Sequence, residues 1–568
     1  MTDVHEVFSR YFREDDSARE IALALSRELE EGGICIEASH FAHLEPPSAR
    51  YLDSNPDDPK PLVLHHKKYY LHKYFHYETR ILAKIQDLFQ SQKELGKFRS
   101  SEIIKNNALV NEIINQYEHD EGVLQILAAL NGFTEPLSIL SGGPGTGKTT
   151  SIKLLLYFIY SLSPEKKIQI LTPTGKAASK INDSLRTESH IQFQQPHLFS
   201  EYIENTEAST IHRALPSIGY KNKNLDADIL IVDEASMVDV GLMARLLQSM
   251  KSTCQLILIG DRHQLASVEA GSIYTDLCIA FGSMQNASDL GKFLSNFHPT
   301  LGAVYHQVSR EQNIAKEHYV ELAKSYRFDR NSGIAELAFD VLNNKLKDLS
   351  SYNTFQDVTV EMEVENPHFE KILLEFRDFI EEDDILQALE KLNKIKVLCA
   401  MRNGPRGINH VTEIIEKTLE KQNLLKPEFS PYHNQAIQIE TNNYELGLFN
   451  GDQGIVRKDK EGQLKAYFKK TETEYLDYPV SILPGFRTAF ALTIHKSQGS
   501  EYDNAVVILP DSVESAILSK QLLYTAITRA KKSLLLIATD QIANESVNKS
   551  VRNATGIADR LITGGLWE

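Results

Sequence analysis

The sequence has few cysteines and no long apolar run. Its 568 residues include only four cysteines, Cys35, Cys254, Cys278 and Cys399, and no two of them form a C-x-x-C pair. This spacing argues against a disulfide framework or a zinc motif, so we expect reduced thiols. The first residues, MTDVHEVFSRYFRED, are charged and lack an apolar signal core, and no later run is long enough to span a membrane. We therefore expect a cytoplasmic protein.

Positive charge is also scarce. The chain carries 61 Lys and Arg residues against 77 Asp and Glu residues, which gives a formal net charge of −16. A protein that coats nucleic acid non-specifically needs a broad basic surface, and this composition argues against one. A narrow basic groove remains compatible with the sequence. At this length we expect several domains, most simply three or four.

Short apolar strands alternate with helical patterns from about residue 121 onward. The runs LSIL, IQIL, ILIV and QLILIG fit buried strands, and a second series with KIKVLCAM, TAFALTIH, NAVVILP and SLLLIAT begins near residue 325. We predict an α/β fold with two parallel-sheet domains, at 116–324 and 325–568. A β-rich insertion at 430–485, with turn signals such as Asn450–Gly451–Asp452, favours a small barrel. Residues 1–115 show mostly helical patterns and no chemical motif.

The segment SGGPGTGKTT, residues 141–150, fits G-x-x-x-x-G-K-[ST] between an apolar strand and a helix. Such a loop lets backbone N–H groups converge on phosphate oxygens at a helix N-terminus. Lys148 is placed to reach the β- and γ-phosphates, and the Thr149 hydroxyl to hold Mg²⁺. We predict an ATP and Mg²⁺ site formed by Gly142, Gly143, Pro144, Gly145, Thr146, Gly147, Lys148, Thr149 and Thr150.

Two further strand ends carry polar residues that suit ATP hydrolysis. Asp233 and Glu234 follow the run ILIV, where a carboxylate of a phosphate-loop enzyme holds Mg²⁺ and a following Glu activates water. Gln264 follows the run LILIG in GDRHQL, where it could sense the γ-phosphate. An acidic turn at a strand end is common by itself, and the interpretation rests on the spacing from Lys148.

Two arginines lie in the second α/β series. Arg327 stands in SYRF, and Arg529 follows TAIT at what we predict to be the start of a helix. An arginine that enters from a facing domain can stabilise the charge of phosphoryl transfer, and it makes hydrolysis depend on domain closure. Either arginine alone is more often part of a surface ion pair.

The motifs together resemble those of superfamily 1 DNA helicases and, within them, the RecD family. The resemblance covers about residues 121–540 and is carried in order by GGPGTGKTT, LTPTGKAASKI, STIHRAL, VDEASMVD, GDRHQLASVEAGS, KSYRF, LTIHKSQGSEYD and LLYTAITRAKK. It implies two RecA-like motor domains with an SH3-like insertion. The length favours the RecD chain of the three-subunit exodeoxyribonuclease V over the longer stand-alone relatives.

The resemblance also implies roles for individual residues. Lys148, Asp233, Glu234, Gln264, Arg327 and Arg529 would act in catalysis. Gln125 would read adenine, although the basic residue that usually stands next to this glutamine is missing here. Single-stranded DNA contacts would come from Thr172, Pro173, Thr174, Lys176, His212, His495, Ser497 and Gln498.

At the level of the whole protein, the resemblance implies 5′→3′ translocation on single-stranded DNA and assembly with RecB-like and RecC-like subunits in double-strand break repair. Residues 1–115 would dock on a partner. We find no carboxylate cluster outside the ATP site that is typical of a nuclease, so the nuclease centre would belong to a partner chain. A stand-alone DNA or RNA helicase, or a DNA-binding regulatory ATPase, remains open as an alternative.

Overall fold

The computed structural model forms two compact units. Unit 1 comprises residues 1–262, 266–326 and 551–568, and unit 2 comprises residues 263–265 and 327–550. The residues that the structure describes are 3–53, 60–108, 110–112, 122–186, 196–215, 224–266, 269–283, 294–295, 297–307, 315–328, 331–427, 429–443, 445–471, 473–513, 515, 517–549 and 555–563.

Unit 1 is built on a seven-stranded sheet with the order β10-β11-β5-β9-β8-β6-β7. Every pair is parallel except the edge pair β10 and β11. The strands are β5 (Leu137–Gly142), β6 (Ile168–Thr172), β7 (Ala208–Thr210), β8 (Ile229–Val232), β9 (Gln255–Gly260), β10 (Ala315–Lys316) and β11 (Tyr319–Leu322). The four strands predicted from apolar runs in this region are confirmed.

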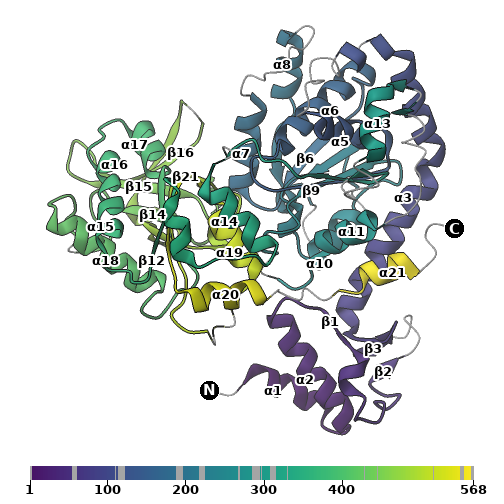
Figure 1. Ribbon diagram of the computed structural model, residues 1–568, viewed down its shortest axis with the longest axis horizontal. Coiled ribbons are helices and arrows are strands. Elements are labelled where there is room, and N and C mark those ends of the chain that lie inside the picture. The colour runs from purple at the N-terminus through teal and green to yellow at the C-terminus, as the bar shows by residue number, and fades with distance from the viewer. Residues whose placement is uncertain are drawn as a thin grey trace. The chain divides into compact units, whose positions relative to one another are not determined.

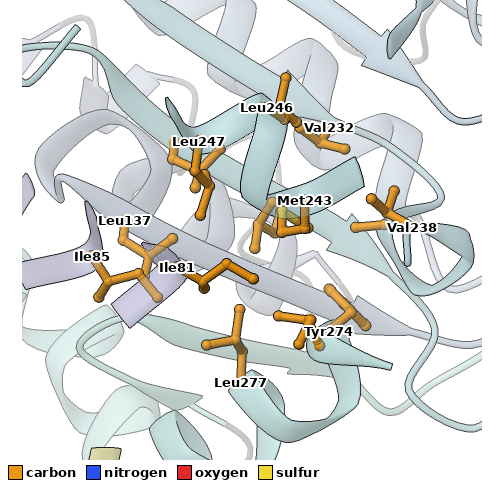
Figure 2. Packing of buried hydrophobic residues seen from close by; sticks show 14 of the residues in the cluster. Ile81, Ile85, Leu137, Val232, Val238, Met243, Leu246, Leu247, Tyr274 and Leu277 are labelled. Atoms are coloured by element: carbon orange, nitrogen blue, oxygen red, sulfur yellow. The ribbon is translucent and has the colours of Figure 1, made fainter. Parts of the chain in front are cut away.

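Continuous apolar runs form these strands because helices cover both faces of the sheet. Along β8, Ile229 and Ile231 join one apolar cluster, whereas Leu230 and Val232 join the cluster on the opposite face. The helices involved include α5 (Val123–Thr134), α6 (Lys148–Leu162), α7 (Gly175–Arg186), α10 (Val240–Gln248) and α11 (Ile273–Gly282). Figure 2 shows one of these clusters, in which side chains from α10 and α11 pack with Leu137 of β5.

The N-terminal part of unit 1 contains a small sheet that the sequence patterns did not predict. Its helices are α1 (Val4–Ser9), α2 (Asp16–Glu30) and the long α3 (His72–Lys105). Between α2 and α3 lies a four-stranded sheet with the order β1-β4-β3-β2, formed by β1 (Cys35–Glu37), β2 (Leu52–Asp53), β3 (Leu62–His65) and β4 (Lys68–Leu71). Helix α3 then packs against α10, and its buried residues join an apolar cluster beneath the seven-stranded sheet.

The C-terminal helix α21 (Ile557–Thr563) also belongs to unit 1, where it lies beside α11 and α3 (Figure 1). We had expected residues up to 568 to belong to the second α/β domain. Instead, Ile557 and Leu561 are buried in an apolar cluster of unit 1. The compact part of unit 2 therefore ends near residue 550.

Unit 2 contains a second parallel sheet with the order β12-β21-β20-β13-β19. Its strands are β12 (Val358–Glu361), β13 (Ile395–Cys399), β19 (Ala491–Thr493), β20 (Tyr502–Ile508) and β21 (Ala530–Ile537). Helices α14 (Gly333–Leu342), α18 (Ile408–Lys421), α19 (Lys520–Ile527) and α20 (Asp540–Asn548) pack around it. Four of the five strands are those predicted from apolar runs.

The predicted β-rich insertion lies between α18 and β19. It is a five-stranded antiparallel sheet with the order β17-β16-β15-β14-β18. The strands are β14 (Ala436–Ile439), β15 (Gln453–Lys458), β16 (Leu464–Lys469), β17 (Tyr475–Pro479) and β18 (Phe486–Thr488). The sheet therefore extends slightly past the predicted end at residue 485.

All four cysteines are buried free thiols. Within the described part of the chain, no helix is both long enough and apolar enough to cross a membrane.

Candidate nucleotide site and nucleic-acid track

The glycine-rich loop connects β5 to α6 at the carboxyl edge of the unit 1 sheet. Gly147, the residue before α6, has a φ of 92°, and a Cβ at this position would lie 2.9 Å from the Gln125 side chain. Only glycine adopts this conformation without strain and leaves room for that neighbour. Gly145 also has a positive φ, of 73°. The loop conformation is thus specified by its glycines.

The side chain of Lys148 folds back over the loop. Its Nζ donates to the carbonyl oxygens of Gly142 at 2.6 Å and Gly143 at 3.1 Å. The Thr146 hydroxyl also donates to the Gly143 carbonyl, at 2.8 Å. The Lys148 ammonium group is therefore held against the loop, where it can contact a bound anion. Thr149 and Thr150 follow in the first turn of α6 and are partly exposed.

Two residues that the sequence analysis did not single out support this loop from the other side. The Ser325 hydroxyl donates to the Pro144 carbonyl at 3.0 Å, and the Tyr326 amide donates to the Gly145 carbonyl at 2.8 Å. Both belong to the motif KSYRF, in which we had considered only Arg327. The boundary between the two units falls directly after Tyr326.

Gln125 lies at the start of α5 and is 4% exposed. Its Nε2 donates to the Thr146 carbonyl at 2.8 Å. Its Oε1 is buried and has no hydrogen-bond donor among the described residues. A buried acceptor without a donor is costly, so this oxygen is suited to a donor that a ligand supplies.

Asp233 and Glu234 follow β8, two strands away from β5 in the sheet. Glu234 has a φ of 53°, a left-handed conformation that costs a non-glycine residue on the order of 1–3 kcal/mol and is typical of functional sites. Burial, and then the neighbouring Glu234 carboxylate, raise the pKa of Asp233, whereas the charge of Lys148 lowers it. The charges of Lys148 and Asp233 therefore lie close enough to interact.

The residues present fit a magnesium ion. Mg²⁺ prefers hard oxygen ligands, and the Thr149 hydroxyl and the Asp233 carboxylate supply them. Burial and then the neighbouring Glu234 carboxylate raise the pKa of Asp233 and so disfavour its negative charge, and a divalent cation would offset both effects.

Gln264 lies just after β9 in the short segment 263–265, which belongs to unit 2. Its side chain is 7% exposed. The next residue, Leu265, fixes this segment: its amide donates to the Thr525 hydroxyl at 2.8 Å, and its carbonyl accepts from Gln498 Nε2 at 2.7 Å. The segment that carries Gln264 is thus held by hydrogen bonds within unit 2.

The two arginines occupy different environments in unit 2. Arg327 Nη2 lies 2.7 Å from Glu501 Oε2 in a largely buried ion pair. Arg529 does not start a helix, as we had expected; it lies between the end of α19 and the start of β21. It is 2% exposed, and it donates to the carbonyl oxygens of Thr525 at 3.0 Å and Ser500 at 2.9 Å. A surface ion pair is therefore excluded as its role.

The third nitrogen of the Arg529 guanidinium, Nη2, is buried and meets no acceptor within the described residues. Nor does Arg529 form an ion pair with any of them, so its charge has no partner there. Such a group is costly in isolation and suits an anion.

The predicted DNA contacts of unit 1 differ in accessibility. Thr172, at the end of β6, is fully buried, and its hydroxyl donates to the Thr174 carbonyl at 2.8 Å. The Thr174 hydroxyl accepts from the Ala177 amide at 3.2 Å, at the start of α7. These two hydroxyl groups therefore stabilise the backbone between β6 and α7. Pro173 and Lys176 are half-buried and lie beside them.

The predicted DNA contacts Ser497 and Gln498 are buried in unit 2. The Ser497 hydroxyl donates to the Ile494 carbonyl at 2.7 Å, and the amide of Gln498 donates to Leu265. Their side chains therefore hold the motif TIHKSQG together, which leaves its backbone and its other side chains for a ligand.

His212 and His495 occupy matching positions in the two units. Each follows an edge strand, β7 in unit 1 and β19 in unit 2. In each motif the threonine hydroxyl accepts from the backbone amide three residues later: Thr210 from Arg213 at 3.2 Å and Thr493 from Lys496 at 3.3 Å. His212 is exposed, whereas His495 is partly buried, and burial lowers the pKa of His495. The repeated T-I-H pattern therefore encodes a repeated turn.

One further group of possible metal ligands was missed in the sequence. Oxygen or nitrogen atoms of Glu135, Glu317 and His318 lie within 4.8 Å of one another. However, Nδ1 of His318 lies 3.2 Å from the Leu137 carbonyl, and Glu135 Oε1 accepts from a threonine hydroxyl. Because backbone and side-chain groups already engage His318 Nδ1 and Glu135 Oε1, we assign no metal there.

Family models match both units. A model described as "AAA domain" matches residues 125–270, and one described as "UvrD-like helicase C-terminal domain" matches residues 488–537.

Full-length relatives match most of the chain. It is 31% identical over 526 residues to the RecBCD enzyme subunit RecD of Buchnera aphidicola subsp. Acyrthosiphon pisum, covering 86% of this chain and 83% of the relative. It is 27% identical to the RecD subunit of Mycobacterium tuberculosis, covering 100% of this chain and 95% of the relative. The ATP-dependent RecD2 DNA helicase of Deinococcus radiodurans is 26% identical, with coverage of 70% and 46%.

Proposed function

The chain belongs to the RecD family of superfamily 1 DNA helicases, and from this premise we propose that it is an ATP-driven motor that moves 5′→3′ along single-stranded DNA. In this proposal it works as the RecD-like subunit of a helicase–nuclease, together with RecB-like and RecC-like chains, in the repair of double-strand breaks. Its place of action is the cytoplasm.

The observation that carries this proposal is the neighbourhood of Lys148 and Asp233. Both follow parallel strands of one sheet, at the edge where open α/β sheets bind their ligands. A loop that presents an ammonium group beside a carboxylate matches the needs of a nucleoside triphosphate with its metal. Thr149 and Asp233 would hold Mg²⁺, which supplies charge neutralisation at the phosphates.

The remaining site residues have roles that follow from their chemistry. Lys148 would neutralise charge on the β- and γ-phosphates, and Glu234 would orient the attacking water. Gln264 would respond to the γ-phosphate. Arg327 and Arg529 would stabilise the charge of the transferring phosphoryl group, and the buried guanidinium without an anion at Arg529 supports this role.

We further propose a role for each accessory part. The five-stranded antiparallel insertion is an SH3-like barrel, which its small size and strand pairing support. Residues 1–115 dock on a partner subunit. The nuclease centre of the assembly lies in a partner chain.

Unwinding assays test the motor. Duplexes with a single 5′ tail or a single 3′ tail are incubated with the purified chain and ATP, alone and together with the RecB-like and RecC-like chains of the same organism. We expect the chain to unwind only the substrate with the 5′ tail. Unwinding from a 3′ tail by this chain alone contradicts the polarity. Co-purification of the three chains tests the assembly, and a chain that never joins the other two supports a stand-alone helicase instead.

A further inference from the structure

Three basic side chains in unit 2 surround a single carboxylate oxygen. Nη2 of Arg402, Nε of Arg487 and Nζ of Lys496 lie 3.7, 3.8 and 3.8 Å from Oε1 of Glu440. None of these distances is short enough for a hydrogen bond. With three positive groups and one negative group, the four side chains have a formal charge of +2. We call these four residues the Glu440 cluster.

The cluster is assembled from separate elements of the fold. Arg402 follows β13, Arg487 lies on β18 of the inserted sheet, and Lys496 lies in the turn after the edge strand β19. Glu440 directly follows β14, and its backbone amide donates to the Gly485 carbonyl at 2.8 Å. The insertion and the motor sheet therefore both supply positive charge to one place.

The Arg487 side chain is held by a hydrogen bond, but one of its N–H donors has no acceptor in the described part of the chain. Its Nη2 donates to Gln438 Oε1 at 3.0 Å, and Gln438 in turn donates to the Gly451 carbonyl at 3.2 Å. Its Nε is buried and has no acceptor among the described residues. Because a buried donor without an acceptor is destabilising, an anion that accepts from Nε would be favoured at this position.

The pKa shifts of the basic residues also indicate that the cluster would favour an added anion. Burial lowers the pKa of Lys496, and the positive charges of Arg487 and Arg402 lower it further, although Glu440 opposes them. Burial likewise lowers the pKa of Arg487. The positive charges in the cluster therefore repel one another, and Glu440 compensates them only in part.

The position of Lys496 connects the cluster to the proposed DNA track. Lys496 follows His495 in the turn that repeats the unit 1 turn at Thr210–Arg213. Both turns lie at the carboxyl end of an edge strand of a parallel sheet, where such sheets bind ligands.

We propose that Arg402, Arg487 and Lys496 bind one backbone phosphate of single-stranded DNA, and that Glu440 occupies the phosphate position while no strand is bound. This inference rests on the proposed function. Two guanidinium groups and an ammonium group offer several N–H donors to a phosphate, which has more acceptor oxygens and more negative charge than the carboxylate. Glu440 then competes with DNA and keeps the affinity of the motor moderate.

Binding of a fluorescent oligo(dT) strand, measured by anisotropy at several salt concentrations without nucleotide, tests the cluster. Arg402→Gln and Lys496→Gln should each weaken binding roughly three- to tenfold at low salt and reduce the slope of log affinity against log salt by about 0.7. Glu440→Gln should strengthen binding by a similar factor. Lys470 and Glu474, an ion pair at 2.9 Å elsewhere in the insertion, provide the controls Lys470→Gln and Glu474→Gln, which should change neither quantity.

The outcomes separate this inference from the proposed function. A parent protein that does not bind oligo(dT) contradicts the proposed function itself. A parent that binds, with Arg402→Gln and Lys496→Gln variants of equal affinity and salt slope, overturns the cluster alone. Weaker binding of Glu440→Gln also overturns it. If the variants lose affinity for a fluorescent ADP analogue and keep their affinity for oligo(dT), the cluster serves the nucleotide and the inference is wrong.

Arg487 is tested by a pair of variants, because its bond to Gln438 gives it a structural role. Arg487→Lys should keep most of the affinity, whereas Arg487→Gln should lose it. If Arg487→Gln does not fold, the Arg402 variant decides, since the Arg402 side chain is 64% exposed and its loss leaves the fold intact.

Discussion

Arg560 Nη1 lies 3.3 Å from Glu78 Oε2, although 482 positions separate the two residues in the sequence. The Glu78 side chain is fully buried, and its other oxygen accepts from the Gly556 amide at 2.7 Å. Arg560 also lies over the Phe75 ring at 4.6 Å. The C-terminal segment is therefore tied to α3 by a buried charge pair, and unit 1 contains both ends of the chain.

We predict that Glu78→Ala strongly destabilises unit 1. The substitution leaves Arg560 without its counter-ion and the Gly556 amide without an acceptor, and loss of one partner from a buried pair costs about 3–5 kcal/mol. Thermal unfolding measures the effect as a lower melting temperature. The control is Glu94→Ala on the same helix, since the Glu94 side chain is 82% exposed and its pair with Lys97 contributes little. Equal melting temperatures for the two variants contradict the prediction.

Asp276 should make the stability of unit 1 depend on pH. Burial raises its pKa to about 7, although a hydrogen bond from Thr555 opposes the shift. Because the pKa of Asp276 is raised in the folded state, the free energy of unfolding is highest below the unfolded pKa of 3.8. It falls as the pH rises from there through the folded pKa of about 7. Each unit of pKa shift corresponds to about 1.4 kcal/mol, so a few kcal/mol is the upper limit.

Asp276→Asn removes this titration and keeps an acceptor for Thr555. The difference in melting temperature between the variant and the parent should therefore be more in favour of the variant at pH 8 than at pH 5. Melting temperatures of both proteins at the two pH values test the prediction. Parallel pH profiles would show that Asp276 does not titrate in this range.

Gln125→Ala should reduce the preference for ATP over GTP. The free Oε1 of Gln125 can accept from the exocyclic amino group of adenine, whereas guanine presents a carbonyl oxygen at that position. Loss of such a bond corresponds to about 1–3 kcal/mol of discrimination. The ratio of kcat/KM for the two nucleotides measures it.

Gln255→Ala is the matched control for Gln125. Gln255 is also a buried glutamine of unit 1, and its Nε2 donates to the Glu135 carbonyl at 2.9 Å. Its loss should lower the stability without changing the nucleotide preference. If both variants keep the ratio of the parent, Gln125 does not read the base.

Lys148→Gln should keep the fold and lose ATP hydrolysis that depends on DNA. The carbonyl groups of Gly142 and Gly143 hold the ammonium group at the loop, and glutamine has no charge with which to neutralise the phosphates. The turnover should fall on the order of 10³-fold or more. Steady-state phosphate release with saturating oligo(dT) measures it, and turnover near that of the parent contradicts the ATP-motor assignment.

The parallel strands could be predicted because helices bury both faces of each sheet, so that β8 and β9 appear in the sequence as unbroken apolar runs. The N-terminal sheet could not. Its β3–β4 hairpin turns through His66 and Lys67, with φ of 46° and 61°, and neither is the Asn or Gly that signals such a turn. The segment LHHKKYYL therefore has the composition of a polar helix surface.

The motif spacing located the nucleotide site but not the direction of each side chain. Ser497 and Gln498 belong to a motif that we associated with DNA, yet both side chains hydrogen-bond within unit 2. Likewise, nothing local to Arg560 indicates Glu78, because pairs so distant in sequence form only when the chain has folded. Contacts of this kind cannot be predicted from the local sequence.

The last prediction concerns Arg529, where catalytic and structural roles overlap. Its two bonds to carbonyl oxygens of Ser500 and Thr525 mean that Arg529→Ala would lower stability as well as activity. Arg529→Lys keeps a positive charge and removes the planar fork of donors that the unpartnered Nη2 would offer to a phosphoryl group. We expect it to bind oligo(dT) without nucleotide as the parent does and to hydrolyse ATP roughly 10³-fold more slowly or worse.

Arg457→Lys provides the comparison for Arg529→Lys. Arg457 is another buried arginine of unit 2, and it donates to the Ile380 carbonyl at 3.0 Å and to Asn434 at 2.6 Å. Its loss should lower the melting temperature while the folded protein keeps its turnover. Single-turnover hydrolysis and thermal unfolding, measured on both variants, therefore separate packing from chemistry. If Arg529→Lys hydrolyses ATP within a few-fold of the parent, Arg529 is a structural residue and Arg327 alone must stabilise the transferring phosphoryl group.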